Sequence, residues 1–370
     1  MFSGLNSQRH YTSLNLIRGL AALVVLAHHV RNQFFVPFDK IPNPTLPEKA
    51  IIFVCGLGPA AVIVFFVLSG FFISSSIIKA AVDNKWSWGK YLIARLSRLY
   101  VVLVPALALT LLWDRLGSLW GLPDSTPGRE SLPVLFGNLL FLQKIYFPTY
   151  GSNDPLWSLS YEFWYYIIFP LIFFAAYDFS APLYKRISVA SLAAILLFVT
   201  GKNIAMYFLI WLLGFVLVII GNQERSPQKP GLLSSFTSIL AAVIFLSSLA
   251  LDRLHLIGSQ FLNDAFIGIA FSVFAYALLN IRQEPNNKLY SFAADRLAGF
   301  SYTLYLVHFP LVGFLGNSVL KVQNSWNFDL LHMCYGILII ALVIVYAITV
   351  WRFTEAKTGM VRFKVTELLS

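Results

Sequence analysis

Ten apolar segments dominate the sequence, and each has the character of a helix that crosses a lipid bilayer. They lie near residues 14–35, 51–78, 97–115, 156–177, 187–201, 204–221, 233–250, 261–281, 299–317 and 329–352. A spanning helix needs about 20 mostly apolar residues, and in lipid the helix satisfies its own backbone hydrogen bonds. The sequence therefore predicts an all-α fold, a polytopic integral membrane helical bundle of about ten transmembrane helices.

Composition supports a membrane protein and argues against a nucleic-acid partner. Hydrophobic residues make up 58% of the chain and charged residues only 12%, about half the charged share of a soluble domain. The net charge of +10 would suggest nucleic-acid binding in a soluble protein. Here the basic residues lie mainly in short connections between apolar segments, so membrane topology explains them better. A basic cytoplasmic face would also suit a polyanionic cofactor.

The distribution of Lys and Arg predicts the orientation. With the N-terminus inside, 17 of the 27 basic residues fall on inner segments, nine fall on the outer side, and Arg18 lies within the first span. Cytoplasmic loops carry such an excess. An even number of spans with cytoplasmic N- and C-termini follows. No linker, repeat or low-complexity tract divides the chain, so we expect one domain over residues 1–370.

Several segments depart from a simple span. The fifth is short, and Gly201 and Lys202 form a tight hairpin into the sixth. The stretch 132–143 is apolar but too short to span, which predicts an interfacial or re-entrant piece. The first span contains charged and polar residues with no cleavage site after it, so it is not a secretory signal. Cys55 and Cys334 show neither disulfide nor metal spacing, and we expect two buried thiols.

Ionisable residues within apolar helices are costly and usually functional. Six residues fit this description: Arg18, His28, His29, Glu162, Asp264 and His308. Arg18 and His29 are eleven residues apart, close to three helical turns, so they share one face about 16 Å apart. His28 points about 100° away. The pair indicates a polar path from the cytoplasm to mid-membrane; alternatively, Arg18 snorkels to the interface and His29 makes a structural hydrogen bond.

Arg95 and Arg98 form a second basic pair at the cytoplasmic start of the third span. Residues three apart share a helix face, and a helix N-terminus also favours anions. The pair predicts a phosphate clamp, or else an ordinary positive-inside anchor.

Three further motifs have a functional and a structural interpretation. Glu162 enters the fourth span from the outer side, where it would orient an imidazole or pair with an arginine or tyrosine. In the motif that precedes it, Trp157 and Ser160 are candidates for binding an acceptor, Trp157 by stacking on a sugar ring or as an interfacial belt residue. Ser69 and Gly70 leave room for a thin pantetheine arm or for close helix packing.

The ninth span carries a polar stripe. Ser301, Tyr305 and His308 recur at i, i+4 and i+7, and Tyr302 lies beside them. The stripe predicts a lining for substrate or water, or a satisfied polar seam between helices.

Together these motifs resemble the acyltransferase-3 family of bacterial membrane acyltransferases. The resemblance rests on Arg18-x10-His29, FFVLSGFFI at 65–73, Arg95-x-x-Arg98, LWSLSYEFWY at 156–165 and SYTLYLVHFPL at 301–311. It implies transfer of an acyl group, commonly acetyl, from cytoplasmic acyl-CoA to a hydroxyl of a glycan or another extracytoplasmic acceptor. It also implies His29 as the essential histidine, Arg18 as its basic partner, Arg95 and Arg98 as the arginine pair and Glu162 as the acidic residue.

Two departures from the family pattern matter. Some members have a C-terminal extracytoplasmic domain, which we do not expect here. A Glu-x-Pro ending often follows the last span, whereas Glu355 is followed by Ala356 and Lys357; this argues against a role for Glu355.

The resulting hypothesis is a multi-pass O-acyltransferase of the bacterial inner membrane that uses acyl-CoA, most commonly acetyl-CoA, and no metal. Arg95 and Arg98, with Arg18, would hold the coenzyme A phosphates, with Ser69 and Gly70 along the pantetheine arm. His29 would act as general base or carry the acyl group itself. Glycans or lipid-linked sugars are the expected acceptors, lined by Trp157, Ser160, Tyr302, Tyr305 and His308. A transporter or channel with a His/Arg relay and a structural membrane subunit are the alternatives.

Overall fold

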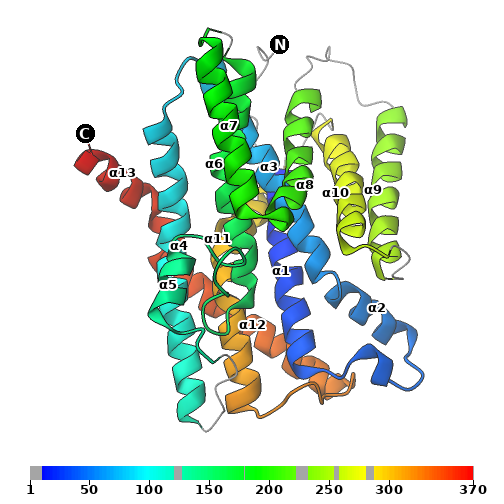
Figure 1. Ribbon diagram of the computed structural model, residues 1–370. Coiled ribbons are helices and arrows are strands. Elements are labelled where there is room, and N and C mark those ends of the chain that lie inside the picture. Colours follow the sequence, from blue (N-terminus) through cyan, green and yellow to red (C-terminus); the bar gives the residue numbers. More distant parts are fainter. Residues whose placement is uncertain are drawn as a thin grey trace. The chain divides into compact units, whose positions relative to one another are not determined.

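Ten long apolar helices form the framework of the protein (Figure 1). The computed structural model describes residues 11–120, 127–178, 180–221, 232–253, 258–280 and 287–369. Within these ranges the candidate membrane spans are Thr12–Phe34, Gly58–Val82, Trp88–Leu119, Asp154–Tyr177, Leu183–Thr200, Lys202–Gly221, Phe236–Arg253, Gln260–Leu279, Lys288–Val319 and Leu330–Leu368. The all-α class and the number and order of spans are confirmed, including the short fifth one.

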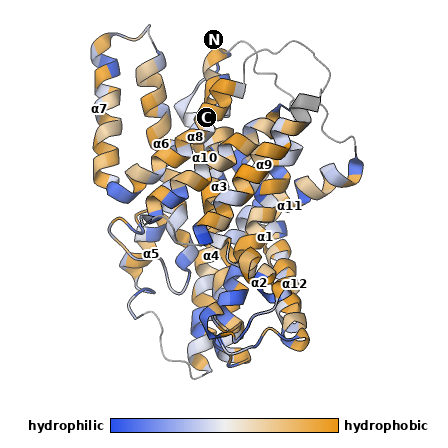
Figure 2. Cartoon of the chain, turned by 90° about the vertical axis from the view of Figure 1, so that its right-hand side faces the viewer, coloured by the Kyte–Doolittle hydropathy of each residue, from blue (hydrophilic) through white to orange (hydrophobic). Residues whose placement is uncertain are grey.

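Apolar side chains cover the outside of the helices, as expected in lipid. Figure 2 shows hydrophobic residues along most of the long helices, and Phe198 on α7 (Leu183–Thr200) is 87% exposed. Cys334 is also exposed, on α12 (Leu330–Phe353), so the expectation of a buried thiol there is wrong. The helix turns that residue outward, where lipid would cover an apolar side chain as well as protein does.

The predicted segment 51–78 is two helices. A short helix, α2 (Leu46–Cys55), ends at Gly56, and α3 (Gly58–Val82) begins two residues later. The backbone N–H and side chain of Thr45 donate to Glu48, forming a capping box that starts α2. The stretch 132–143 contains α5 (Leu132–Leu139), whose eight residues are too few to span a membrane.

The contacts divide the chain into two units that alternate along the sequence, and each is described by itself. The first unit comprises Met1–Leu14, Ile63–Ser87 and Ser158–Asn287. It holds most of α3 and α6 (Trp157–Tyr177), then α7, α8 (Lys202–Gly221), α9 (Leu232–Arg253) and α10 (Gln260–Leu279). Within it, α10 packs on α8 and α9, and α7 packs on α8.

The second unit comprises Asn15–Val62, Trp88–Trp157 and Lys288–Ser370. It contains most of α1 (Thr12–Phe34), then α2, α4 (Trp88–Leu119), α5, α11 (Lys288–Phe314), α12 and α13 (Thr358–Leu369). The central helix is α11, which packs on α4 and α12. A π-helical turn, Leu315–Val319, continues it.

Close packing at Gly19 brings α1 against α11. A Cβ atom on Gly19 would lie 2.4 Å from the Cβ of Leu297, so a larger residue does not fit without a shift. The resulting contact places α1, with the two residues of the predicted catalytic pair, directly beside the central helix of this unit.

Candidate active site

Arg18 and His29 face the same neighbour, α11. The Arg18 Nη2 atom donates to the carbonyl oxygen of Ala298 at 3.2 Å, and the His29 ring lies 5.2 Å from the His308 ring between centroids. The partners follow each other along α11 in the same direction as Arg18 and His29 along α1, so the two helices run parallel. The shared helix face predicted from the spacing is confirmed.

His28 and His29 differ in what their nitrogens do. The Nδ1 atom of His28 lies 2.9 Å from the Cys55 carbonyl oxygen, which can only accept, so this nitrogen carries the hydrogen. Its Nε2 atom then accepts from Asn32 Nδ2 at 2.9 Å. His29 has no hydrogen-bond partner among the described residues and packs edge-on against Phe309 at 4.7 Å. His29 is therefore the imidazole of the pair whose nitrogens are open for chemistry.

Cys55 lies beside this pair but is poorly suited to nucleophilic attack. Burial raises the pKa of its thiol above the ordinary value, and the charge of Arg31 only partly opposes the effect. The thiolate is the nucleophilic form of cysteine, so a raised pKa leaves Cys55 in the unreactive form at neutral pH.

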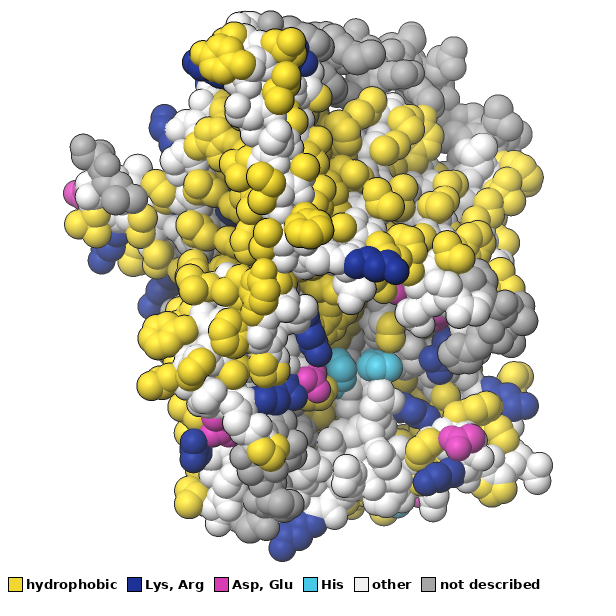
Figure 3. Space-filling view, viewed as in Figure 1, with side chains coloured by type: hydrophobic (Ala, Val, Ile, Leu, Met, Phe, Trp, Pro, Cys, Tyr) yellow, Lys and Arg dark blue, Asp and Glu magenta, His cyan; other side chains and the backbone are white. Residues whose placement is uncertain are grey.

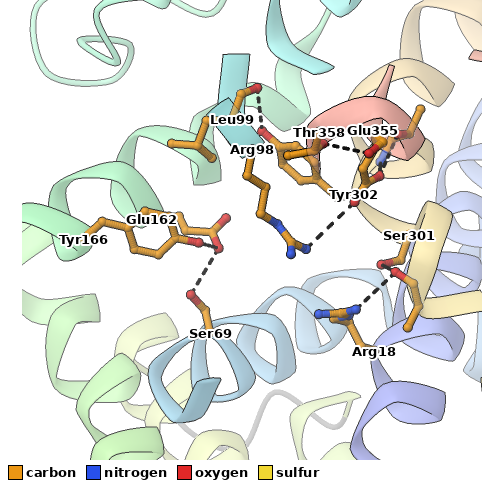
Figure 4. Close-up of polar contacts among 12 residues, drawn as sticks. Arg18, Ser69, Arg98, Leu99, Glu162, Tyr166, Ser301, Tyr302, Glu355 and Thr358 are labelled. Carbon is orange, nitrogen blue, oxygen red and sulfur yellow. Dashed lines mark hydrogen bonds and ion pairs between the residues drawn. The ribbon is translucent and has the colours of Figure 1, made fainter. Parts of the chain in front are cut away.

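Glu355 joins the basic residues, although the sequence pattern after the last span argued against a role for it. Its Oε2 atom accepts from the Thr303 backbone N–H at 3.2 Å and from the Thr303 hydroxyl at 2.8 Å. Arg98 Nη2 lies 3.9 Å from Glu355 Oε1 (Figure 4), and the charge of Arg18 also acts on this carboxylate. A carboxylate directly after an apolar span, on a face rich in Lys and Arg, is the signal that could have indicated it.

The two arginines of α4 have different surroundings. The Arg95 guanidinium lies over the Tyr91 ring, 5.5 Å from its centroid, a cation–π arrangement. The Arg98 side chain is 39% exposed beside Glu355. A guanidinium has five N–H donors and binds phosphate oxygens through parallel hydrogen bonds.

Most of the polar stripe of α11 is bonded to main-chain carbonyls. Ser301 donates to Ala298 at 2.8 Å, Tyr305 to Pro155 at 3.2 Å and Tyr302 to Leu99 at 3.4 Å. These bonds favour the satisfied seam between helices over a substrate lining for the three hydroxyl groups.

In the first unit, Glu162 is held by side chains from its own helix and from α3. Ser69 donates to its Oε1 atom at 3.1 Å, and Tyr166, one turn along α6, donates to the same oxygen (Figure 4). The Trp211 indole in turn donates to the Ser69 hydroxyl at 3.2 Å. Neither Tyr166 nor Trp211 was assigned from the sequence, although Tyr166 follows Glu162 by four residues. The action of Glu162 on His29 stays a prediction.

The remaining candidates are placed as follows. Gly70 packs against α8, since a Cβ there would lie 2.0 Å from the Trp211 carbonyl oxygen; this is the packing role that the sequence left open. Trp157 begins α6 and is part exposed, and Ser160 is fully buried. Asp264 accepts from Tyr207 at 2.5 Å and from Gln260 at 3.0 Å, which satisfies both of its oxygens.

Donor binding by Ser69 and Gly70 stays a prediction. Acceptor binding by Trp157 and Ser160 stays a prediction as well.

Histidine side chains gather in one place on the face seen in Figure 3. Within the described parts of the chain, no group of three or more His, Cys, Asp or Glu side chains could hold a metal ion.

Fold and site thus define a multi-pass helical membrane protein with an arginine–histidine pair directed into one of its units. Comparison with known proteins then assigns the family: the acyltransferase domain model of the acyltransferase-3 family matches residues 11–351. The chain belongs to this family, and the protein is a membrane acyltransferase.

Two curated proteins are similar to this chain. The acyltransferase MdmB of Streptomyces mycarofaciens is 27% identical over 355 residues, which covers 85% of this chain and 83% of that protein. An uncharacterized protein of Haemophilus influenzae is 28% identical over 142 residues, 36% of this chain and 56% of that protein. No solved structure matches the chain significantly.

Proposed function

We propose that the protein moves an acyl group, most commonly acetyl, from cytoplasmic acyl-CoA to a hydroxyl of a glycan or lipid-linked sugar. The observation that carries this proposal is the placement of Arg18 and His29 on one face of α1, against α11. One residue supplies a positive charge and the other an open imidazole, about three helical turns apart. An elongated acyl donor that carries phosphates needs a positive charge for its phosphates and an imidazole near its acyl group, at two separate points.

The basic residues of the second unit are proposed to bind the donor. Arg98, Arg95 and Arg18 bring guanidinium groups to the ends of α4 and α1 that are expected to face the cytoplasm. Guanidinium groups bind phosphate oxygens through parallel hydrogen bonds. Glu355 neutralises part of this charge, because it lies beside Arg98 and the charge of Arg18 also acts on its carboxylate.

His29 is proposed to act as general base. Its open nitrogen accepts the proton of the acceptor hydroxyl while the hydroxyl oxygen attacks the thioester carbonyl. The new C–O bond forms, the C–S bond breaks, and the proton passes from His29 to the departing coenzyme A sulfur. In the alternative route, His29 itself attacks the thioester and then passes the acyl group to the acceptor.

Extracytoplasmic sugars are proposed as acceptors on the family resemblance. O-antigen, exopolysaccharide, a lipid-linked sugar or an antibiotic-like glycoside each offer the required hydroxyl. The similarity to the acyltransferase MdmB over most of both chains supports the acyl transfer itself.

The test uses inside-out vesicles from the native host, which hold the natural acceptor, and radiolabelled acetyl-CoA. We expect label to enter the glycan or lipid fraction with release of free thiol. His29→Gln should lower the rate by a factor of about 100 or more, the usual share of a general base, with the protein still in the membrane. The matched control His332→Gln alters a histidine paired with Asp329 at the start of α12 and should keep the wild-type rate.

Two outcomes contradict the proposal. Full transfer by the His29→Gln variant would remove this residue from the mechanism. Solute flux across the vesicle membrane without any acyl transfer would favour a transporter that uses the buried histidine and arginine as a relay.

A further inference from the structure

His308 on α11 holds a ring nitrogen that no described residue satisfies. The side chain is 1% exposed, and its Nε2 atom is buried without a hydrogen-bond partner. Buried polar atoms in folded proteins are nearly always hydrogen-bonded, because an unbonded one loses its hydrogen bonds to water and gains none in the protein. An exception beside the proposed general base suggests a hydrogen bond that forms during the reaction.

The other ring nitrogen fixes the tautomer of His308. Its Nδ1 atom lies 2.9 Å from the carbonyl oxygen of Leu304. A carbonyl oxygen only accepts, so Nδ1 must carry the hydrogen of the neutral ring. Nε2 is then a bare lone pair, and the group it awaits is a hydrogen-bond donor.

The neighbours of His308 narrow the choice of donor. His29 is also an imidazole. Its ring centroid lies 5.2 Å from that of His308, and the two ring planes make an angle of 37°. The ring of Tyr305 lies 6.1 Å away, but its hydroxyl donates to Pro155. Phe309, 6.3 Å away, has no polar hydrogen. His28 donates from Nδ1 to Cys55 and accepts at Nε2. Of these neighbours, His29 alone has open nitrogens.

We propose that His308 is a positioning residue for His29: its Nε2 atom accepts a hydrogen bond from the His29 N–H and so fixes the His29 ring and stabilises its protonated form. When His29 takes the proton of the acceptor hydroxyl, it becomes an imidazolium with two N–H groups. One faces the reacting atoms, and the other is directed to His308. No proton leaves the pair until His29 returns it to the departing sulfur of coenzyme A.

This arrangement gives His308 the part that a carboxylate plays beside the histidine of hydrolytic triads. A neutral acceptor adds no second charge to an apolar interior, where an unpaired charge is costly. The inference rests on the proposed function of His29 and adds the residue that orients it.

The test compares two amides at position 308. The oxygen of glutamine reaches roughly the place of Nε2, whereas the shorter asparagine reaches only that of Nδ1. We expect His308→Asn to lower kcat for acetyl transfer by about 10- to 100-fold, the factor that corresponds to one hydrogen bond to a charged group. The KM for acetyl-CoA should stay within a factor of about two, since the arginines are unchanged. His308→Gln should recover most of the rate.

Both variants are measured in the native-host vesicles, and melting in detergent is recorded for each. If asparagine destabilises the protein, His308→Phe takes its place, because it keeps a ring in the buried position. Two results would overturn the role of His308. One is a wild-type kcat for His308→Asn or its replacement His308→Phe. The other is an equal loss of kcat in His308→Gln and His308→Asn when both variants are equally stable. Full activity of His29→Gln would instead overturn the proposed function, so the two failures are distinguishable.

Discussion

Glu162 shows how a catalytic candidate depends on residues that a motif does not reveal. Ser69 and Tyr166 both donate to one carboxylate oxygen of Glu162, and the Trp211 indole N–H donates to the Ser69 hydroxyl. Donors of this kind hold a carboxylate in one orientation. The sequence predicts room at Ser69 for a pantetheine arm or for close helix packing; its hydrogen bond to Glu162 shows that it also holds this carboxylate.

Removal of the Ser69 hydroxyl tests this task. We expect Ser69→Ala to lower the acyl-transfer rate by about 10-fold or more, as the loss of a hydrogen bond to a charged group implies. Ser272→Ala is the matched control, because among the described residues the Ser272 hydroxyl donates only to Gly268 in its own helix, and its rate should be unchanged. A wild-type rate for Ser69→Ala in the vesicle assay would show that the bond to Glu162 is dispensable.

For Glu355, the sequence pattern argues against a functional role, whereas the contacts in the structure support one. The absence of the Glu-x-Pro ending argued against it, yet its carboxylate accepts from Thr303 and faces Arg98. The sequence could not reveal the bonds to Thr303, because they join residues 52 positions apart, on α11 and after α12.

Substitution of Glu355 should destabilise the protein in a graded way. Glu355→Ala takes the acceptor from the buried Thr303 hydroxyl, which should cost about 1–3 kcal/mol. Glu355→Gln keeps an acceptor oxygen and should cost less. Thermal unfolding in detergent micelles measures both variants. Equal melting temperatures for wild type and Glu355→Ala would contradict the structural account of this residue.

At the scale of elements, hydropathy and spacing predicted most of what is seen. All ten spans were expected from segment length, and the shared face of Arg18 and His29 followed from helical geometry. The break of segment 51–78 was missed because residues 51–55 at the end of α2 are all apolar, like the span that follows, so composition alone does not divide them. Contacts between helices, such as the crossing of α3 and α8, depend on tertiary packing and have no periodic signal.

The crossing of α3 and α8 is made by glycine on both helices. A Cβ on Gly214 would lie 2.2 Å from the Val67 carbonyl oxygen, and one on Gly70 would meet Trp211. Trp211 on α8 donates to Ser69 on α3, and Ser69 donates to Glu162. The crossing of α3 and α8 therefore also affects the position of Glu162.

Alanine at Gly214 should force the two helices apart. We expect Gly214→Ala to destabilise the protein by about 1–3 kcal/mol, the usual cost of overpacking, and to lower activity. Gly221→Ala in the same helix is the control, since nothing lies within 4 Å of its added Cβ. Thermal unfolding in detergent measures both, and equal stability of the two variants would rule out a tight crossing.

The whole molecule is a membrane-embedded helical fold that belongs to a family of acyltransferases. The ten spans and the family are established. The cytoplasmic orientation of the basic helix ends stays a prediction from the Lys and Arg distribution. The sequence alone pointed to His29, Arg18, Arg95, Arg98 and Glu162. It could not show the open nitrogens of His29 or the acceptor on His308, because these depend on which partners the folded chain supplies.

The most direct test of the central claim is mass spectrometry of the surface glycans from three strains of the native host. One carries the intact gene, one lacks it, and one carries His29→Gln. We predict that the glycan of the first strain is heavier by one acyl group than those of the other two. Identical glycans in all three strains would contradict acyl transfer to a surface sugar by His29.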